Sequence, residues 1–464
     1  MKKTKLLITA ITTLNFALAT LNCSAQYIKL LDFNGANGKE PNGGLISDGT
    51  FLYGLTYHGG ANDYGSIFKI KPNGTGYVDL FDFIAGVPTG IFPNGSLFSD
   101  GTFLYGTASQ GGLSANGTIY KIKPDGTGFA KIYDFTGIQN GDTPIGTLIS
   151  DGTFLYGLTT GAVFKIKPDG TGFTTLHTFD TTGTDGRIPN DKLISDGSFL
   201  YGTNTEGGVN NNGTIFKIKP DGTGYANLCN FTDTTNGKNP ESSLISVGTF
   251  LYGMTARGGA HGYGTIFKIK PDGTNYTKIF DFDGTNGLFP IGSLAFDGTF
   301  LYGTTSWGGV NSDGNLFKIK PDGTGFLNLM DFDSVNGSDP NGSLIFDNAG
   351  FLYGMTSAGG THDTGTIFRY QYCTNNCTTG ITENNAEINM VNVYPNPSNG
   401  IINVEVGQLE NVQIKIYDVL GKSVYQNNTS ANLRIDLTTQ PEGIYFINIK
   451  TNEDAINKKI VINH

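Results

Sequence analysis

One short string, Gly-Thr-Phe-Leu-Tyr-Gly, returns seven times in near-identical form between residues 49 and 354, and it constrains the fold more than any other feature. Its tyrosines are spaced by 52, 51, 45, 51, 50 and 51 residues, and they are Tyr53, Tyr105, Tyr156, Tyr201, Tyr252, Tyr302 and Tyr353. A period of about 50 residues is typical of one supersecondary unit that stacks on copies of itself. The chain is therefore a repeat protein over most of its length.

Each copy contains four runs with the character of β-strands. In the second copy these runs are residues 95–100, 102–108, 117–124 and 128–135. They are short, rich in aromatic and β-branched residues, and bounded by Gly, Asp, Asn and Pro. No helical periodicity appears between residues 27 and 372. Four antiparallel strands in each radially repeated unit predict the blade of a β-propeller.

Two turns in each copy carry their own signals. Asp100-Gly101 joins the first two runs and favours a type I′ hairpin, in which both residues take positive φ. Pro124-Asp125-Gly126 joins the last two and favours a turn with a left-handed glycine. Most lysines between residues 27 and 372 lie in the Lys-Ile-Lys-Pro-Asp-Gly segments before this turn, which predicts a solvated outer rim.

The two ends of the array predict a closed ring. Residues 27–33 read as a fourth strand without the preceding three, and the last copy stops after its third strand, residues 365–372. We expect these two orphan strands to pair, because the pairing removes two free edges that would invite aggregation. The predicted fold class is all-β, a seven-bladed β-propeller over residues 26–372 in which the N-terminal strand closes the last blade.

The N-terminus has the pattern of an export signal. A basic segment, residues 1–5, precedes a mostly apolar stretch, residues 6–21, and small residues precede Gln26. We therefore expect a signal peptide, residues 1–25, that is cleaved between Ala25 and Gln26. The apolar stretch is too short to span a membrane, and no other run could do so.

Cysteine use leaves two questions open. Cys23 allows the alternative reading of a lipoprotein cysteine, although Asn22 suits that reading poorly. Cys373 and Cys377 are close enough in sequence to pair in an oxidising compartment, and their pairing stays open.

Charge excludes one class of partner. The net charge is −10, and the sequence has no basic stripe or arginine cluster of the kind that binds nucleic acid.

After residue 372 the composition changes. Residues 373–389 are polar and non-repetitive, which predicts a linker. Residues 390–464 contain six alternating runs, which predict a small β-sandwich, and they are 400–406, 412–418, 423–426, 433–437, 443–450 and 457–463.

This tail resembles the type IX secretion sorting domain (type A) of Bacteroidetes. The residues that carry the likeness include Tyr394, Pro395, Asn396, Pro397, Gly400, Gly421, Lys422, Gly443 and Tyr445. The resemblance implies passage through the periplasm, then export by the type IX secretion machinery to the medium or the outer cell surface. The repeat itself resembles the Gloeobacter/Verrucomicrobia-type propeller repeat, a family without an established chemistry.

The candidate binding residues lie in the most variable loops. In a propeller, two kinds of loop gather on one face: those that connect the second and third strands of a blade, and those that lead into the next blade. Here the first kind contains the Gly-Gly segments and the second kind the Asn-Gly-x-x-Pro segments. The residue before the double glycine is His58, Gln110, Glu206, Arg257, Trp307 or Ala358, and the third copy has a deletion at Thr160. Changing side chains on a constant scaffold are typical of a binding face. The alternative is that these loop positions merely tolerate change.

Metal sites have weaker support in the sequence. Asp281 with Asp283, and Asp331 with Asp333, could each offer two oxygens to Ca²⁺, although such residues commonly bond turn backbones instead. His58, His261 and His362 lie on Gly-Gly loops of the first, fifth and seventh copies, which are not all neighbours. We therefore predict no metal centre or cofactor.

Two functional hypotheses remain. The first is a non-enzymatic binding module for a glycan or protein ligand, in which Trp307, the only tryptophan, and Tyr57 could stack on sugars. The second is an extracellular carbohydrate-active hydrolase or lyase, which would need a unique cluster of acid and base residues. No nucleophile motif or phosphate loop occurs, and the residues mostly repeat, which favours binding.

Overall fold

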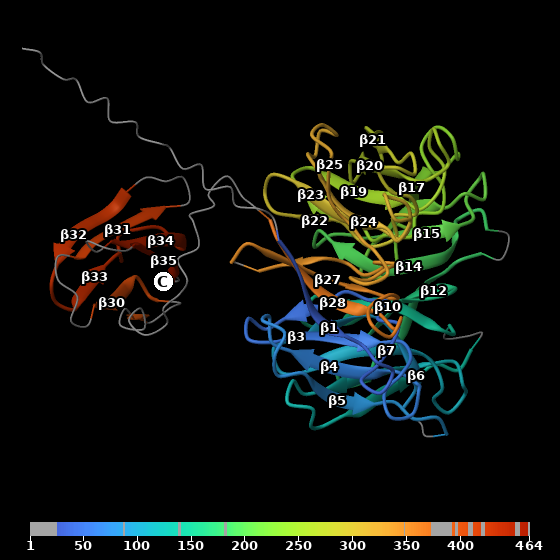
Figure 1. The fold of residues 1–464 in the computed structure, drawn as a ribbon, viewed down its shortest axis with the longest axis horizontal. Coiled ribbons are helices and arrows are strands. Elements are labelled where there is room, and N and C mark those ends of the chain that lie inside the picture. The colour runs from blue at the N-terminus through green and yellow to red at the C-terminus, as the bar shows by residue number, and fades with distance from the viewer. Residues whose placement is uncertain are drawn as a thin grey trace, which may run out of the picture. The chain divides into compact units, whose positions relative to one another are not determined.

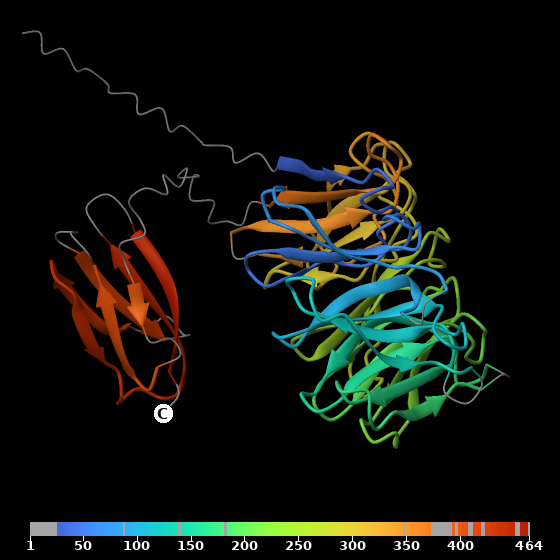
Figure 2. The same cartoon turned by 90° about the horizontal axis from the view of Figure 1, so that it is seen from below.

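A computed structural model describes residues 26–86, 89–137, 141–180, 183–347, 349–372, 392–394, 398–406, 412–418, 423–450 and 455–462. The expected signal peptide, the linker and the two cysteines after residue 372 lie outside these ranges. The chain divides into two compact units, one within Ser24–Asn375 and one within Asn376–His464 (Figures 1 and 2). All regular elements in the described ranges are strands, and no helix there is long and apolar enough to cross a membrane.

The first unit is a series of seven four-stranded antiparallel sheets. In pairing order the first three are β2 (Ile46–Ser47), β3 (Leu52–Thr56), β4 (Ser66–Ile70), β5 (Val78–Asp82); β6 (Ile91–Ser99), β7 (Leu104–Gln110), β8 (Thr118–Ile122), β9 (Ala130–Asp134); and β10 (Pro144–Ser150), β11 (Leu155–Thr159), β12 (Ala162–Ile166), β13 (Thr174–Thr178). The next three are β14 (Arg187–Ser195), β15 (Leu200–Glu206), β16 (Thr214–Ile218), β17 (Ala226–Asn230); β18 (Ile245–Val247), β19 (Phe250–Thr255), β20 (Thr265–Ile269), β21 (Thr277–Asp281); and β22 (Ala295–Phe296), β23 (Leu301–Thr305), β24 (Asn315–Ile319), β25 (Leu327–Asp331). Each copy of the repeat thus supplies one sheet, except at the two ends of the series.

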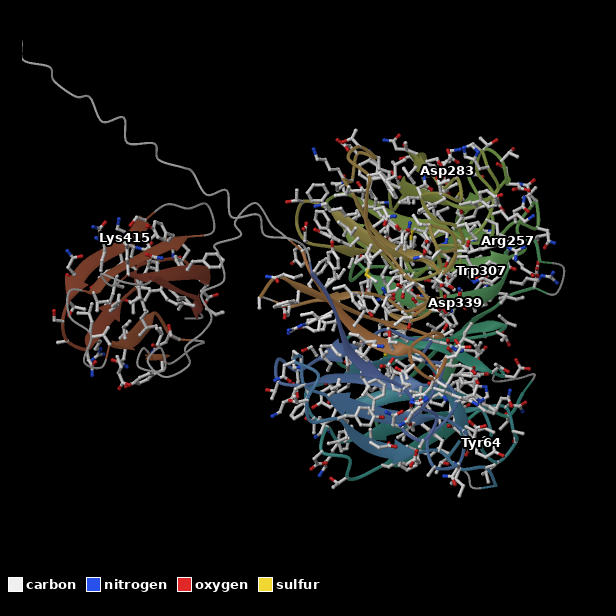
Figure 3. All side chains as sticks on the ribbon, viewed as in Figure 1. Tyr64, Arg257, Asp283, Trp307, Asp339 and Lys415 are labelled. Carbon is white, nitrogen blue, oxygen red and sulfur yellow. The ribbon has the colours of Figure 1, made fainter. Side chains whose placement is uncertain are left out.

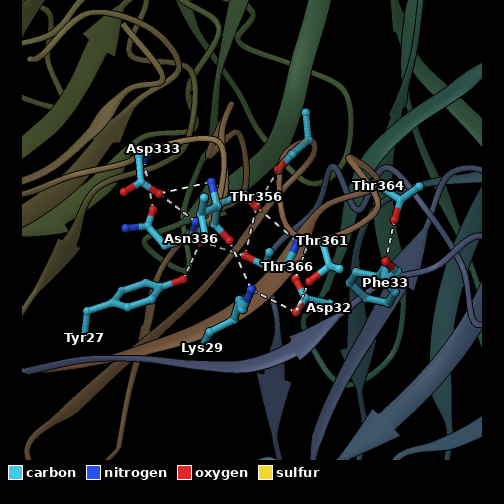
Figure 4. A network of polar contacts seen from close by, with 12 residues as sticks. Tyr27, Lys29, Asp32, Phe33, Asp333, Asn336, Thr356, Thr361, Thr364 and Thr366 are labelled. Carbon is cyan, nitrogen blue, oxygen red and sulfur yellow. Dashed lines mark hydrogen bonds and ion pairs between the residues drawn. The ribbon is translucent and has the colours of Figure 1, made fainter. Parts of the chain in front are cut away.

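The last sheet joins those two ends. It pairs β26 (Ile345–Phe346), β27 (Phe351–Thr356) and β28 (Thr366–Gln371) with β1 (Gln26–Asp32). β1 runs antiparallel to β28, with Tyr27 opposite Tyr370 and Asp32 opposite Thr366. Further bonds tie β1 to the last copy in Figure 4, where Asp32 Oδ1 accepts the backbone N–H of Thr361 at 3.1 Å. The first strand of the repeat unit is therefore the outer strand of its last sheet.

Apolar side chains pack between neighbouring sheets. One cluster joins Tyr53 and Ile67 of the first copy to Leu104 and Tyr120 of the second. Tight packing also explains the glycine of the Tyr-Gly pair, because a Cβ at Gly54 would lie 2.4 Å from the Phe68 ring on the next strand. The repeated string is therefore a packing requirement between the second and third strands.

The Asp-Gly turn differs from the predicted type I′ hairpin. Gly101 has φ of 87°, but Asp100 is not among the residues with positive φ. The Asp100 carboxylate instead accepts the backbone N–H groups of Thr102 and Phe103, at 2.8 and 2.7 Å, and the Tyr105 hydroxyl at 2.8 Å. Burial opposes ionisation, but these hydrogen bonds lower the pKa of Asp100. The carboxylate shapes the turn, which is why Asp recurs there.

The lysines of the third strands do not form the simple solvated rim that the sequence predicts. The first lysine of the segment is half-buried: Lys69 lies over the Phe51 ring at 4.8 Å. It also donates to the carbonyl of Pro124 in the next copy at 3.0 Å. These lysines therefore tie neighbouring sheets together, and the second lysine, such as Lys71, is the exposed one.

The second unit contains two antiparallel sheets. One pairs β29 (Asn392–Tyr394), β30 (Ile401–Glu405) and β33 (Leu433–Asp436), and the other pairs β32 (Ser423–Thr429), β31 (Val412–Asp418), β34 (Gly443–Lys450) and β35 (Ala455–Ile462). Alternating residues such as Ile402, Ile414 and Ile447 are fully buried in a shared core. The six predicted strands of the tail correspond to β30–β35, and the sequence reading missed β29.

The second copy carries a defect in the packing of the Tyr-Gly pair. Six copies place a phenylalanine against this glycine, but the second has Tyr120, whose buried hydroxyl has no hydrogen-bond partner among the described residues. We expect Tyr120→Phe to raise the free energy of unfolding by about 1 kcal/mol, because it removes an unsatisfied polar group. Chemical denaturation measures the free energy of unfolding. The reciprocal variant, Phe68→Tyr, buries an unsatisfied hydroxyl in the first copy and should lower that free energy by about 1–3 kcal/mol. A loss of stability in Tyr120→Phe would contradict the assignment.

Candidate functional site

The residue before a proline takes the left-handed backbone conformation once in every copy. These residues have φ between 49° and 58°, and they are Glu40, Phe92, Thr143, Ile188, Asn239, Phe289 and Asp339. This conformation is uncommon for residues with a side chain, and proline restricts its predecessor further. Surrounding contacts must therefore impose it. These positions were not among the predicted site residues, although a changing residue before a constant proline is a usable signal in the sequence.

Backbone hydrogen bonds from two directions hold Phe289 in place. Its N–H donates to the carbonyl of Tyr263 in the preceding copy at 3.2 Å, and its carbonyl accepts the N–H of Ser306 at 3.0 Å. Leu288 and Trp307 exchange two further bonds, at 2.8 and 3.1 Å. The loop before the proline and the loop before the double glycine therefore form one fixed unit.

A fourth-strand carboxylate anchors the next part of the loop. Asp331 Oδ1 accepts the N–H of Val310 at 3.1 Å, and Asp281 Oδ1 accepts that of Ala260 at 2.8 Å. Equivalent bonds hold Ala61, Leu113, Val209 and Thr361. The regular recurrence of this Asp or Asn thus has a structural cause, which is the positioning of the loop face.

A cavity of about 230 Å³ opens beside Trp307. Residues of the fifth, sixth and seventh copies line it, and they are Glu241, Arg257, Phe289, Ile291, Ser306, Trp307, Asp339 and Asn341. Trp307 is 52% exposed, and its ring meets Phe289 edge to face at 5.2 Å. The guanidinium of Arg257 lies 4.9 Å from the centre of the same Phe289 ring. Figure 3 shows Arg257, Trp307 and Asp339 following one another along one side of the repeat unit.

The carboxyl groups of this cavity have altered acidity. Burial raises the pKa of Glu241, against an opposing effect of the Arg257 charge. Burial likewise raises the pKa of Asp339, against a hydrogen bond from Trp307. The cavity therefore combines an aromatic surface, a cation and two carboxyl groups that hold their protons more tightly than usual.

A second cavity, of about 510 Å³, shares Arg257 and Glu241 with the first. It also contains Glu206, which forms an ion pair with Arg187 at 2.6 Å, and Lys238. Three of the predicted site residues, Glu206, Arg257 and Trp307, thus line two adjoining cavities.

The other predicted site residues lie in different surroundings. Tyr57 stacks on Phe92 at 5.2 Å, and His58 meets the same ring at 4.8 Å. His58 also lies 3.7 Å from the Glu40 carboxylate. Gln110 is exposed at the end of β7 and lines neither cavity. His58 therefore contacts the pre-proline Phe92 of the next copy as Arg257 contacts Phe289, whereas Glu206 pairs with Arg187, so the chemistry differs from copy to copy.

A third cavity, of about 300 Å³, has residues of every copy in its lining. They include Asn42, Asn94, Ile145, Asn190, Glu241, Ile291 and Asn341, each directly after the constant proline. Asp191 departs from the repeat, since most copies have glycine there. Its carboxylate accepts the hydroxyls of Ser243 and Ser293, at 2.5 and 2.9 Å.

The four aspartates considered for Ca²⁺ bond to the protein itself. Asp283 Oδ1 accepts Thr285 and Asn286 N–H groups, both at 3.0 Å, and Asp333 Oδ1 accepts that of Asn336 at 2.7 Å. Asp281 forms an ion pair with Lys278 at 2.8 Å, and Asp331 Oδ1 accepts Asn328 at 3.0 Å. No group of three or more His, Cys, Asp or Glu suited to a metal occurs within the described part of the chain.

Comparison with protein families identifies both parts of the chain. The family model described as the Gloeobacter/Verrucomicrobia repeat matches residues 16–162, 159–272 and 246–402, which together span more than half of the sequence. The chain belongs to the Gloeobacter/Verrucomicrobia repeat family. Residues 392–463 match the secretion system C-terminal sorting domain, as the resemblance to type IX sorting domains implies. Such a tail indicates export to the cell surface or the medium.

Of the nine residues that carry the sorting resemblance, Tyr394, Gly400, Gly443 and Tyr445 lie among the described residues. Gly443 and Tyr445 belong to β34, and the Tyr445 hydroxyl donates to the Pro441 carbonyl at 2.7 Å. Pro395, Asn396, Pro397, Gly421 and Lys422 lie outside those ranges.

Solved structures resemble this Gloeobacter/Verrucomicrobia repeat protein in fold. The extracellular domain described as a hybrid two component system of B. thetaiotaomicron is 14% identical, with a TM-score of 0.51, over 95% of this chain and 59% of that one. An oligogalacturonate lyase in complex with manganese is 13% identical, with a TM-score of 0.47, over 75% of this chain and 93% of that one. The likeness to the first of these structures shows the fold alone, which is all-β and propeller-like. No curated protein matches the sequence.

The first copy of this Gloeobacter/Verrucomicrobia repeat protein carries an unusual pair beside its loop anchor. Five other copies place Lys or Asn three residues before the anchoring Asp or Asn, as in Asn328 with Asp331. Here Asp79 precedes Asp82. Burial, followed by the charge of Asp82, raises the pKa of Asp79 to about 7. The folded state therefore binds this proton more tightly than the unfolded chain does, and the protein should lose stability as the pH rises from about 4 through 7.

We expect Asp79→Asn to remove this loss. The variant should gain at most about 1 kcal/mol at pH 8 and nothing near pH 4, since the Asp79 residue as a whole is exposed and solvent screens its charge, even though its carboxyl group is partly withdrawn from water. Urea unfolding at both pH values measures the difference. Asn328→Asp in the sixth copy builds the same pair and should show the opposite change. Equal effects of Asp79→Asn at pH 4 and pH 8 would contradict the proposed titration.

Proposed function

We propose that this protein is a secreted binding module rather than an enzyme, and that it takes a glycan in the cavity beside Trp307. The observation that carries this proposal is the half-exposed indole on the wall of a 230 Å³ cavity. Sugar rings stack well on such a surface, and polar groups at the edge of an apolar pocket fix orientation. Here Ser306 and Asn341, which bond to each other at 2.7 Å, can offer these polar contacts.

The scaffold of this module is proposed to be a closed ring of seven blades over residues 26–372. Support comes from contacts that repeat around the series and also join its ends. Arg369 of the last copy donates to the carbonyl of Pro72 in the first at 3.3 Å, as Lys69 does to Pro124 in the second. Phe33 packs in one cluster with Leu52 and Met355. The 300 Å³ cavity, with all copies in its lining, then corresponds to the central channel.

The route to the outside is proposed to use both ends of the chain. A signal peptide, residues 1–25, would deliver the chain to the periplasm, and the tail, residues 390–464, would direct it through the type IX machinery. The linker, residues 373–389, would leave the ring free once the tail is removed.

One observation favours the enzymatic alternative, a carbohydrate-active hydrolase or lyase. Glu241 and Asp339 face one cavity, and both have a raised pKa, as a general acid requires. Reducing-sugar release from the same glycans that bind, lost in Glu241→Gln, would support this alternative over simple binding.

Array screening first identifies a glycan that binds. We expect Trp307→Ala to weaken the binding free energy of that glycan by about 2 kcal/mol or more, because aromatic anchors dominate such sites. Titration calorimetry of the mature chain measures the change. Val310→Ala is the matched control, since Val310 is 81% exposed three residues away and lies outside the cavity. Equal losses in both variants, or none in Trp307→Ala, would place the site elsewhere.

Removal of residues 390–464 should leave the repeat unit folded but retained in the periplasm of its native host. The two units have separate cores, so the loss of one should not unfold the other. Cell fractionation with an antibody to the repeat unit follows the protein. Arrival of the truncated chain at the surface or in the medium would show that export does not need the tail.

A further inference from the structure

Among the described residues, Arg257 differs from Lys39, Arg187 and Lys238 in forming no ion pair, although its charge acts on the nearby Glu241 carboxyl group. Lys39 lies 3.1 Å from Asp63, Arg187 lies 2.6 Å from Glu206, and Lys238 lies 3.6 Å from Asp233. Arg257, by contrast, forms no ion pair within the described ranges, and it is exposed.

The surroundings of Arg257 hold its guanidinium in a defined place. Its backbone exchanges two hydrogen bonds with Lys238, at 2.8 and 3.0 Å. Its guanidinium lies over the Phe289 ring, which also meets the Trp307 ring at nearly a right angle. A guanidinium stacked in this way keeps its planar set of N–H donors, which fits a carboxylate or a sulfate with two parallel hydrogen bonds.

Arg257 also lies where the two cavities adjoin. The larger one contains Arg187, Lys238 and Arg257, although the chain has only four arginines and a net charge of −10. One of its two carboxylates, Glu206, is already paired with Arg187. Lys238 is likewise paired with Asp233, so Arg257 is the cation of this concave site that forms no ion pair among the described residues, and it stands beside an aromatic wall.

We propose that the ligand of this site is an anionic glycan, with a sugar ring on Trp307 and the acidic group of a neighbouring sugar at Arg257. The inference rests on the proposed glycan-binding function and narrows it to sugars that carry carboxylate or sulfate groups. A neutral glycan would cover the Arg257 donors without supplying a charged acceptor, which costs free energy. An extended polyanion is disfavoured by the net charge, so the recognised segment is short.

The test compares matched charged and neutral sugars on the mature chain. The probes are a short alginate oligosaccharide and its carboxyl-reduced form, together with sulfated and unsulfated dextran of equal length. We expect at least one acidic probe to bind at least tenfold more tightly than its neutral match. The preferred acidic probe shows whether a carboxylate or a sulfate is the better ligand.

Two variants separate the site from general charge attraction. Arg257→Gln should lower affinity for the acidic probe by about 10- to 100-fold and leave the neutral probe unchanged, in line with a charged hydrogen bond. Lys123→Gln also removes one positive charge, at an exposed lysine of the second copy, and should change the affinity for neither the acidic nor the neutral probe. Circular dichroism and the melting temperature confirm that both variants fold.

Three results would overturn the inference. Equal affinity for acidic and neutral probes, with binding still dependent on Trp307, would reject the acidic preference and leave the proposed function in place. Equal losses in Arg257→Gln and Lys123→Gln would show non-specific attraction. Tighter binding of poly-glutamate than of any sugar would reject a glycan and identify an acidic peptide, and the proposed function would fail with it.

Discussion

The close approach of an aromatic ring to a glycine on the neighbouring strand is the constraint on which the sheets depend. At Gly54 and Gly354 a Cβ would lie 2.4 and 2.5 Å from the ring atoms of Phe68 and Phe368. No side chain can replace hydrogen at that distance, so the second and third strands of each sheet keep one spacing. Because every copy repeats this contact, the sheets have the same form, and variation is confined to the loops.

The loops that carry the pre-proline residues combine backbone strain with a fixed network of backbone hydrogen bonds. A non-glycine residue in the left-handed conformation costs about 1–3 kcal/mol, and this fold contains one before a proline in every copy. Bonds such as those from Phe289 to Tyr263 and Ser306 make the conformation independent of the side chain. The position can therefore hold Phe, Asp, Ile or Asn without a change in the backbone. Such positions suit the evolution of binding specificity on a fixed scaffold.

The strands and their order were predictable because they depend on local patterns that repeat. The pairing of residues 27–33 with the third strand of the last copy followed from counting strands. The type of turn at Asp100 was predicted wrongly, because residue propensity alone does not show that the Asp100 carboxylate accepts a hydrogen bond from the Tyr105 hydroxyl. The cavity beside Trp307 was predicted only in part. Trp307 and Arg257 stood out as loop residues, but Phe289, which lies between them, belongs to a different loop, and only tertiary packing brings the loops together.

The differences between copies decide which loops keep a cation and an aromatic face open to solvent, as the proposed glycan site needs. In the first copy the loop residue His58 lies beside a carboxylate, Glu40, and in the fourth Glu206 lies beside Arg187, so each of these loop residues already contacts a polar side chain of the protein. In the fifth and sixth copies Arg257 and Trp307 share a phenylalanine instead, which leaves one cation and one aromatic face open to solvent. A regular ring of identical loops would present the same weak contact many times. Breaking that regularity at two adjoining copies concentrates charge and aromatic surface in one place, as recognition of a single ligand requires.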